Sequence, residues 1–473
     1  MRKTKIVITL GPALMQGDRL REALKEADAV RLNASHGDPE SRAAALEQVR
    51  SLALDLGRFI PVFLDLQGPK WRIGMLDAPL DLVDGSEGVF YTPGTPVPQG
   101  VAWAAPLPHP ELFEGAKPGQ IWLLDDGAIT VRILTKGSDL LGAVVIIGGP
   151  LKARKGIRPI GMDIAVDPLT EKDHLDIRWG VEHHVDLFAQ SFVRRASDVQ
   201  QLKAIIRHLG GTQPIIAKIE HPTALANLEE IFEVSWAVMV ARGDLGVELG
   251  VERVPGLQKQ IIMAARKALK PVITATQMLE SMIEHTQPTR AEASDVANAI
   301  WDGTDAVMLS AESASGAHPL EAIQWLARIA READAEGNQH MTPLSEAMDK
   351  QVLSHTDISV AFAACRTAQE IHARWILAFT EGGGTARMVS RLAGQIPVLG
   401  ATVDELIARR LGLMRGVTAL IIPRVDSTDE MVEAVRALLI AKHGAQSHDR
   451  IVMTMGVPLW KSGTTNTMKV MTF

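Results

Sequence analysis

The sequence has 473 residues, a formal net charge of −7 at pH 7 and an isoelectric point of about 6.1. A chain of this length exceeds the size at which a single hydrophobic core stops growing, so we expect two to four domains. The mildly acidic balance gives no indication of a nucleic-acid or membrane-surface partner. A single cysteine, Cys365, excludes a disulfide framework and a cysteine metal site, which fits a reducing cytoplasm.

The first residues superficially resemble a signal peptide, because basic residues precede an apolar run. That run, 6–10, ends at Gly11-Pro12 and no small-residue cleavage site follows it. Its β-branched residues favour a short buried strand instead. No other segment approaches the roughly 18 apolar residues needed to span a bilayer, so we expect a soluble protein.

Short apolar runs rich in β-branched residues recur along the first two thirds of the chain, alternating with helical periodicity. They cover residues 5–10, 29–35, 61–66, 186–191, 214–220, 237–244, 271–277 and 306–312. Continuous apolar strands that alternate with helices are typical of a parallel sheet covered on both faces. Eight such units predict a (β/α)₈ TIM barrel.

The third and fourth runs are separated by about 120 residues, far more than a strand-to-helix connection requires. The segment 71–154 is rich in Gly and Pro and contains short alternating runs. We interpret it as an inserted small β-barrel lid domain. The main barrel is then expected to occupy residues 1–70 and 155–340.

A polar stretch, 333–357, is predicted to be a linker with a helical piece. Helical and strand patterns alternate after it, with predicted strands at 375–380, 397–402, 419–423, 450–455 and 467–473. This order predicts a C-terminal doubly wound α/β domain over residues 341–473.

Polar and charged residues close the predicted barrel strands, and in such barrels the carboxyl ends of the strands form the active site. For any one of them, a solvated strand end or an ion pair at the rim is the more ordinary explanation. A whole set at one end of the barrel favours a site. The set is Arg31, Asn33, Ser35, Asp65, Ser191, Lys218, Glu220, Arg242, Asp244, Thr276, Gln277, Ser310 and Glu312.

Glu220 and Asp244 end neighbouring predicted strands, so two hard oxygen ligands could share one Mg²⁺ and leave positions for substrate oxygens. Lys218 precedes Glu220 by two residues, and strand alternation places both side chains on the same face. Gly243 allows backbone N–H groups to approach a carboxylate or phosphate closely. A metal beside a cation suits a polyanionic substrate.

At these residues the chain resembles the pyruvate kinase family, and the resemblance runs nearly end to end. The matching stretches are 5–12, 31–37, 65–70, 169–173, 217–220, 239–248, 273–282, 288–292, 295–298, 302–308 and 463–466. Several long motifs in the family's order make a chance resemblance negligible.

The resemblance implies an enzyme that transfers phosphate from phosphoenolpyruvate to ADP, the last step of glycolysis, and that works as an allosteric homotetramer in the cytoplasm. Glu220 and Asp244 would bind Mg²⁺, with Mn²⁺ as an alternative, and Lys218 would stabilise the phosphoryl group in transit. The other implied site residues are Arg31 and Arg72 for phosphate; Thr276, Arg242, Gly243 and Asp244 for the substrate; and Arg31, Arg154 and Lys155 for the nucleotide. Such positioning and charge neutralisation supply most of the catalysis in phosphoryl transfer.

Many family members also bind K⁺ next to the phosphate, and this sequence departs from their pattern. The expected position comprises Asn33, Ser35, Asp65, Leu66 and Lys70. Leu66 lacks the usual threonine oxygen, and Lys70 carries an ammonium where those members have a carboxylate. We therefore predict activity without K⁺; the alternative is that Lys70 faces solvent and K⁺ still binds.

A Gly-rich turn in the C-terminal domain is predicted to bind the phosphate of a sugar-phosphate or nucleotide effector. It comprises Thr380, Gly382, Gly383, Gly384 and Thr385. A strand that leads through glycines into a helix presents N–H groups to phosphate, although an ordinary Gly-rich turn has the same pattern. Glu381 replaces part of the hydroxyl-rich loop of family members regulated by fructose bisphosphate, so a different or weaker effector is expected.

Two other functions remain open at this stage. A metal-dependent aldolase that holds a pyruvate enolate would explain Glu220 and Asp244, but not the insert, Lys218 or the third domain. A catalytically silent, metabolite-binding family member would be expected to lose Lys218 or Thr276 first, and both are present.

Overall fold

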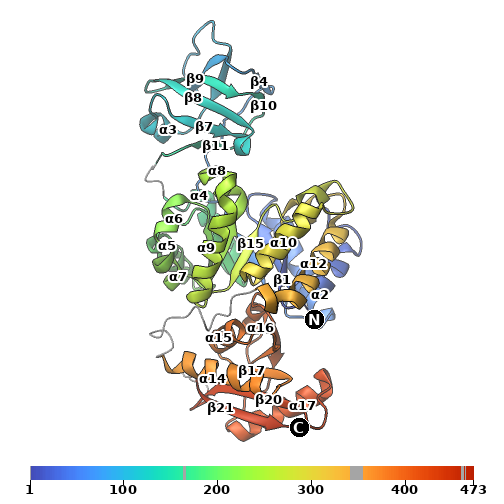
Figure 1. Ribbon diagram of the computed structural model, residues 1–473. Coiled ribbons are helices and arrows are strands. Elements are labelled where there is room, and N and C mark those ends of the chain that lie inside the picture. Colours follow the sequence, from blue (N-terminus) through green and yellow to red (C-terminus); the bar gives the residue numbers. More distant parts are fainter. Residues whose placement is uncertain (1, 163–166, 341–354, 460–462, 464) are drawn as a thin grey trace. The chain divides into compact units, whose positions relative to one another are not determined.

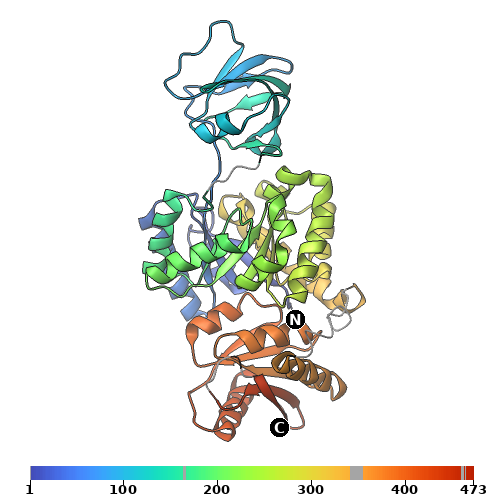
Figure 2. The same ribbon diagram turned by 90° about the vertical axis from the view of Figure 1, so that its left-hand side faces the viewer.

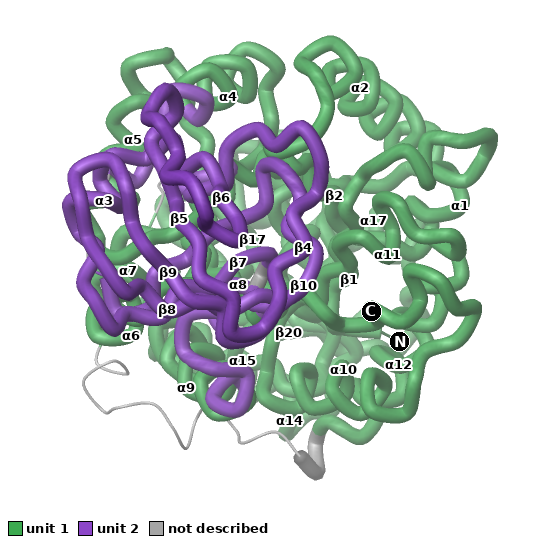
Figure 3. Tube along the Cα trace, turned by 90° about the horizontal axis from the view of Figure 1, so that it is seen from above, with its two compact units in different colours: residues 1–66, 174–242, 255–473 green, residues 67–173, 243–254 purple. Residues whose placement is uncertain are grey.

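The computed structural model describes residues 2–162, 167–340, 355–459, 463 and 465–473 (Figure 1). They form two compact units, which are coloured separately in Figure 3. The first unit comprises Met1–Leu66, His174–Arg242 and Pro255–Phe473, and the second comprises Gln67–Asp173 and Gly243–Val254. The barrel and the C-terminal α/β domain therefore belong to one unit, and the insert predicted over 71–154 falls within the other.

A closed barrel of eight parallel strands forms the first part of unit 1, as predicted. Its order is β1-β16-β15-β14-β13-β12-β3-β2. The strands are β1 (Lys5–Thr9), β2 (Ala29–Asn33), β3 (Val62–Asp65), β12 (Leu187–Gln190), β13 (Ile215–Ile219), β14 (Ala237–Ala241), β15 (Val272–Ala275) and β16 (Ala306–Leu309). Most of their residues are buried, since helices cover the outside and side chains fill the inside.

Helices surround these strands in both views of the molecule (Figures 1 and 2). They are α1 (Arg19–Glu26), α2 (Pro39–Asp55), α4 (Glu171–Glu182), α5 (Ala196–His208), α6 (Pro222–Ala226), α7 (Leu228–Val234), α9 (Val254–Lys267), α10 (Arg290–Asp302), α11 (Ala311–Ala314) and α12 (Pro319–His340). The helix α8 (Arg242–Leu249) follows β14 in the chain, and its residues after Arg242 belong to unit 2. In α10 a capping box between Thr289 and Glu292 satisfies the first backbone N–H groups.

Two predicted strands end three residues earlier than expected. In the run 237–244 the strand ends at Ala241, and α8 begins at the next residue, Arg242. In the run 306–312 the strand ends at Leu309. A polar tail after a strand has the same composition as the first turn of a following helix, so the sequence pattern does not separate them. The predicted linker 333–357 also begins as helix, because α12 continues to His340; residues 341–354 lie outside the described part.

The C-terminal part of unit 1 is a five-stranded sheet of order β19-β18-β17-β20-β21, in which only β21 runs antiparallel. Its strands are β17 (Trp375–Phe379), β18 (Val398–Thr402), β19 (Val417–Ile421), β20 (Arg450–Gly456) and β21 (Thr465–Thr472). The helices are α14 (Thr356–Glu370), α15 (Gly384–Leu392), α16 (Glu405–Leu411) and α17 (Thr428–His443). This is the predicted doubly wound α/β arrangement.

Alternating residues of β17 divide the core of this domain into two layers. Ile376 and Ala378 pack with buried side chains of α14, α15 and α16, whereas Trp375, Leu377 and Phe379 pack with α17. A strand period of two places successive side chains on opposite faces of the sheet, so helices cover both faces.

The barrel and the C-terminal domain share apolar contacts. Leu413, which follows α16, packs into the cluster that fills the barrel interior. Trp236, immediately before β14, packs against both this cluster and the core of the C-terminal domain. The start of β14 is therefore in direct contact with the C-terminal domain.

Unit 2 contains a mixed six-stranded sheet of order β11-β7-β8-β9-β5-β6 and a two-stranded sheet of β4 and β10. The bounds are β4 (Leu80–Leu82), β5 (Glu87–Tyr91), β6 (Trp103–Pro106), β7 (Ile121–Leu124), β8 (Ile129–Lys136), β9 (Leu140–Ile147), β10 (Gly149–Leu151), β11 (Ile157–Pro159) and the short helix α3 (Pro110–Gly115). Phe90, Trp103 and Trp122 lie at its core. Strand β11 lies beyond Arg154, the last residue of the predicted insert.

Across the described residues, we find no helix that is both long enough and apolar enough to cross a membrane.

Candidate active site

Lys218 lies at the centre of a polar cluster at the carboxyl end of the barrel strands. Its Nζ donates to Ser191 Oγ at 2.7 Å and lies 2.9 Å from Glu220 Oε1 and 3.2 Å from Asp65 Oδ1. These partners come from the ends of β3, β12 and β13, which are neighbours in the barrel. The predicted placement of Lys218 and Glu220 on one face is confirmed by their contact.

Arg31 supplies a second cation to the same cluster. Its Nε donates to Asp65 Oδ2 at 2.6 Å, and its Nη1 donates to Thr9 Oγ1 at 3.1 Å. Burial alone would raise the pKa of Asp65, but the charges of Lys218 and Arg31 outweigh it, so this pKa lies below its usual value. Asp65 therefore carries a stable negative charge that orients both cations.

Glu220 is fully buried and held in a fixed orientation. The backbone N–H of Phe192 donates to Glu220 Oε2 at 3.0 Å, while Oε1 faces Lys218. A fixed carboxylate offers hard oxygen atoms, the donor type that Mg²⁺ prefers, so this residue fits the predicted metal role. The described residues contain no ready-made cluster of three or more His, Cys, Asp or Glu side chains around one point.

Arg242 and Thr276 form a second group in unit 1. The guanidinium of Arg242 donates to the Thr276 carbonyl oxygen, at 2.7 Å from Nη2, and to Asp295 Oδ2, at 2.6 Å from Nη1. Thr276 and Gln277 have positive φ values of 68° and 53°. A β-branched residue in this region is strained, and such strain concentrates at functional sites. Arg242 thus binds the strained turn after β15 by donating to the backbone carbonyl oxygens of Thr276 and Gln277.

Three predicted basic residues lie in unit 2. Arg72 Nη1 donates to the carbonyl oxygen of Arg154 at 3.0 Å, and Lys155 Nζ lies 2.6 Å from Asp125 Oδ1. Arg154 also has a positive φ of 61°. The segment of Arg72, which is predicted to bind phosphate, therefore lies next to the segment of Arg154 and Lys155, which are predicted to bind the nucleotide.

Asp244 and Lys70, also in unit 2, are close to each other. Lys70 Nζ lies 3.9 Å from Asp244 Oδ1. Asp244 and Gly243 lie in the first turn of α8, which follows β14 directly. In the other unit, Asn33 Oδ1 accepts the Ser35 N–H at 3.1 Å, and the Leu66 side chain is buried. Leu66 thus contributes a buried alkyl side chain and no side-chain oxygen.

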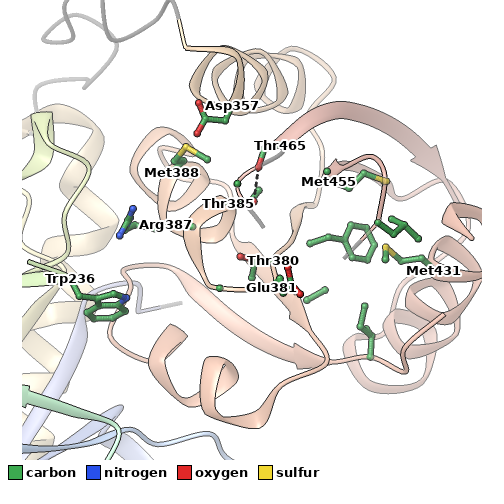
Figure 4. A pocket seen from close by; sticks show the side chains of 18 residues that line it. Trp236, Asp357, Thr380, Glu381, Thr385, Arg387, Met388, Met431, Met455 and Thr465 are labelled. Atoms are coloured by element: carbon green, nitrogen blue, oxygen red, sulfur yellow. Dashed lines mark hydrogen bonds between the residues drawn. The ribbon is translucent and has the colours of Figure 1, made fainter. Parts of the chain in front are cut away.

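A separate pocket of about 310 Å³ lies at the predicted effector turn (Figure 4). Thr380, Glu381 and Thr385 line it, with Arg387 from α15 and Trp236 from the barrel. Gly383 has a φ of 86° at the start of α15, a conformation that suits glycine. Thr385 Oγ1 and Thr465 Oγ1 are 2.7 Å apart, and residues 460–462 and 464 of the predicted effector loop lie outside the described part.

Comparison with known proteins decides the family. The family model described as "Pyruvate kinase, barrel domain" matches residues 1–323, and the model described as "Pyruvate kinase, alpha/beta domain" matches residues 358–471. The chain belongs to the pyruvate kinase family. The resemblance seen in the sequence motifs is thereby confirmed.

Full-length relatives agree with this assignment. A pyruvate kinase of Agrobacterium vitis is 43% identical over 471 residues, covering 99% of this chain and 98% of the relative. One from Geobacillus stearothermophilus is 40% identical over 482 residues, covering 99% and 80%. The crystal structure of a pyruvate kinase from Cryptosporidium parvum superposes with a TM-score of 0.88 at 30% identity, covering 100% of this chain and 96% of that one. The chain is an enzyme of the pyruvate kinase class.

Sequence reasoning did not single out several residues that hold these site groups. Thr9 binds Arg31, and Asp295 binds Arg242. Both lie inside the pyruvate kinase motifs, and this position is a sequence signal that could have identified them. Asp125, Arg387 and Trp236 carried no comparable signal.

Proposed function

We propose that this pyruvate kinase family member transfers the phosphoryl group of phosphoenolpyruvate to ADP, giving pyruvate and ATP. In this step the bond from phosphorus to the enol oxygen breaks, a bond to the terminal ADP oxygen forms, and the enolate takes up a proton. The observation that carries the proposal is the Lys218 cluster at the carboxyl end of a barrel that matches the family over its whole length. The aldolase alternative leaves Lys218 unexplained.

The charges of Lys218 and Arg31 offset the negative charge of the phosphoryl group in transit, and Arg72 adds a third cation. Lys218 has three N–H donors and already faces Ser191, Glu220 and Asp65. A phosphoryl oxygen must therefore replace one of these partners. Because Asp65 and Glu220 hold the ammonium in place before substrate arrives, little reorganisation is needed during transfer.

Glu220 and Asp244 are the residues that we propose to hold Mg²⁺, with Mn²⁺ as a substitute. A divalent cation there would polarise the substrate oxygens and neutralise developing charge. Thr276 and the N–H groups of Gly243 and Asp244 are proposed to orient the substrate carboxylate, Thr276 to assist enolate protonation, and Arg31, Arg154 and Lys155 to contact the nucleotide.

We further propose that no K⁺ is required. Two observations support this: both oxygens of Asp65 already face fixed cations, Arg31 and Lys218, and Leu66 offers only a buried alkyl group. The ammonium of Lys70 supplies another fixed positive charge beside Asp244.

The pocket at residues 380–385 is proposed to bind the phosphate of a sugar-phosphate or nucleotide effector. Burial and the charge of Arg391 lower the pKa of Arg387, so a phosphate would relieve an unfavourable environment for this guanidinium. Trp236 supports coupling to the barrel, because it lines the pocket and also precedes β14, which leads into Arg242. This proposal is tested by measuring whether sugar phosphates and nucleotides activate the wild-type enzyme and the variant Thr385→Val.

The experiment that tests the function measures ATP formation from phosphoenolpyruvate and ADP with Mg²⁺, first without K⁺ and then with KCl. ATP formation without K⁺ supports the reaction and K⁺ independence together. ATP formation only with KCl keeps the reaction and rejects K⁺ independence. No ATP formation under either condition favours the aldolase or the silent metabolite-binding protein. A homotetramer and a cytoplasmic location are proposed from the family resemblance alone.

A further inference from the structure

The segment that carries Arg72 is bound on one side by a neighbouring extended segment. Ile73 N–H donates to the Lys155 carbonyl at 2.8 Å, and Ile157 N–H donates to the Trp71 carbonyl at 3.0 Å. Arg72 forms an antiparallel bridge with Gly156 between these two bonds. Successive N–H groups of an extended strand point to opposite sides, so the N–H of Arg72 points away from residues 154–157 and needs another acceptor.

His109 provides that acceptor. The backbone N–H of Arg72 donates to His109 Nε2 at 3.1 Å. On the same side, Gly74 N–H donates to the Pro106 carbonyl at 2.8 Å. The stretch from the end of β6 to the start of α3 thus takes the place of a second neighbouring strand, and the histidine ring supplies one of its two bonds.

Glu111, on α3, favours the histidine tautomer that this contact requires. Its Oε1 accepts the Trp71 indole N–H at 2.9 Å and lies 3.6 Å from His109 Nδ1. A carboxylate on that side attracts a proton to Nδ1 and leaves the lone pair of Nε2 for Arg72. Burial lowers the pKa of His109 despite the opposing charge of Glu111, so the ring is neutral at pH 7.

We infer that His109 is a positioning residue for the reaction, which holds the backbone of Arg72 so that its guanidinium is presented to the phosphate of the substrate. The other anchor of Arg72 is its own side chain, which donates to the Arg154 carbonyl. Without His109, the Arg72 N–H loses its acceptor, and on that side of the segment only the bond from Gly74 N–H to the Pro106 carbonyl remains. This inference rests on the proposed function, because it assigns Arg72 to phosphoenolpyruvate.

The test compares two amide replacements that differ in reach. In His109→Gln the amide lies near the position of Nε2 and can accept from Arg72. In His109→Asn the amide lies near Nδ1 and can reach only toward Glu111. His208→Asn, an exposed residue at the end of α5 in unit 1, is the matched control. For each variant, kcat, the KM for phosphoenolpyruvate and the melting temperature are measured with Mg²⁺.

We expect His109→Asn to lower kcat/KM for phosphoenolpyruvate about tenfold, mainly through KM, as loss of one acceptor for a backbone donor predicts. His109→Gln should remain within about twofold of wild type at a similar melting temperature. Wild-type kinetics in His109→Asn, or equal losses in both variants, would overturn the inference while leaving the proposed function intact. A wild type that forms no ATP would overturn both.

Discussion

At the scale of single residues, the site depends on charges that stabilise one another. Lys218 lies between Asp65 and Glu220, and Asp65 also binds Arg31. Each carboxylate would be costly to bury alone, and each gains a cation partner. The cluster is therefore held together before any substrate is bound, and removal of one member affects the others.

Replacing Lys218 with Met should lower kcat by about a thousandfold, because a preorganised charge at the transferring group is lost. It should also move acid unfolding to higher pH. The depressed pKa of Asp65 contributes stability that is present above the unfolded carboxyl pKa and lost as pH falls through the folded one; without Lys218 that folded pKa rises. Steady-state kinetics and acid titration by circular dichroism measure both effects.

Lys267→Met is a suitable control, since Lys267 is exposed at the end of α9. Turnover in Lys218→Met that matches this control would refute the role assigned to Lys218.

Replacing Lys70 with Glu should create a requirement for K⁺. The substitution removes a fixed cation beside Asp244 and adds a second carboxylate there. We expect K⁺-free kcat to fall about tenfold and KCl to restore most of it, as a like-charge pair favours cation binding. ATP formation is measured across a KCl titration at constant ionic strength. Lys152→Glu, an exposed position in the same unit, should leave the KCl response unchanged; the same flat response in Lys70→Glu would contradict the prediction.

At the scale of elements, one buried aspartate connects the barrel to the C-terminal domain. Asp186, immediately before β12, accepts from Val62 N–H at 2.7 Å, from Arg50 Nη2 at 2.6 Å and from Arg409 Nε at 2.8 Å. Arg409 belongs to α16, so this carboxylate orients β3, α2 and α16 together. Its burial means that the contacts are screened little by solvent.

Asp186→Asn should destabilise the protein by about 3 kcal/mol, because two partly buried guanidinium groups lose their counter-charge. The melting temperature, measured by calorimetry, should fall by several degrees. Asp55→Asn removes an exposed ion pair with Arg21 and should cost less than about 1 kcal/mol. Equal melting temperatures for the two variants would show that Asp186 has no special structural role.

At the scale of the whole molecule, Lys3 connects the first barrel strand to the C-terminal domain. Its Nζ donates to the Gly394 carbonyl at 3.0 Å and to Gln395 Oε1 at 2.5 Å, and its backbone N–H donates to Asp334 Oδ2 at 2.6 Å. Burial and the charge of Arg415 lower the pKa of Lys3 to about 7, against the opposing effect of Asp334. The folded protein therefore prefers the neutral amine.

This lowered pKa predicts a contribution to stability that increases with pH. Between about pH 7 and about pH 10 the unfolded chain holds more protons on Lys3 than the folded chain, so ΔG of unfolding rises with pH. Lys3→Met should remove that increment from the dependence of melting temperature on pH. Lys25→Met, at an exposed helix position, serves as the control. Parallel curves for wild type and Lys3→Met would contradict the assignment.

Several features followed from the sequence alone. The period of apolar residues predicted the eight barrel strands and the alternation of the C-terminal domain, because burial on one or both faces is a local property of each segment. Polar residues at the strand ends indicated Lys218, Glu220 and Asp65, because parallel strands bring their carboxyl ends to one edge. The places where strands turn into helices, as at Arg242, were not separated by this pattern.

The tertiary structure alone decided which distant groups meet. His109 reaches Arg72 across 37 residues, and Arg409 reaches Asp186 across 223. Trp236 lines a pocket made mainly by the other domain of its unit. Such partners have no periodicity or spacing in the chain, since they are selected by packing between separately formed elements. The sequence thus determined the elements and the chemical groups, and packing determined which groups hold one another in place.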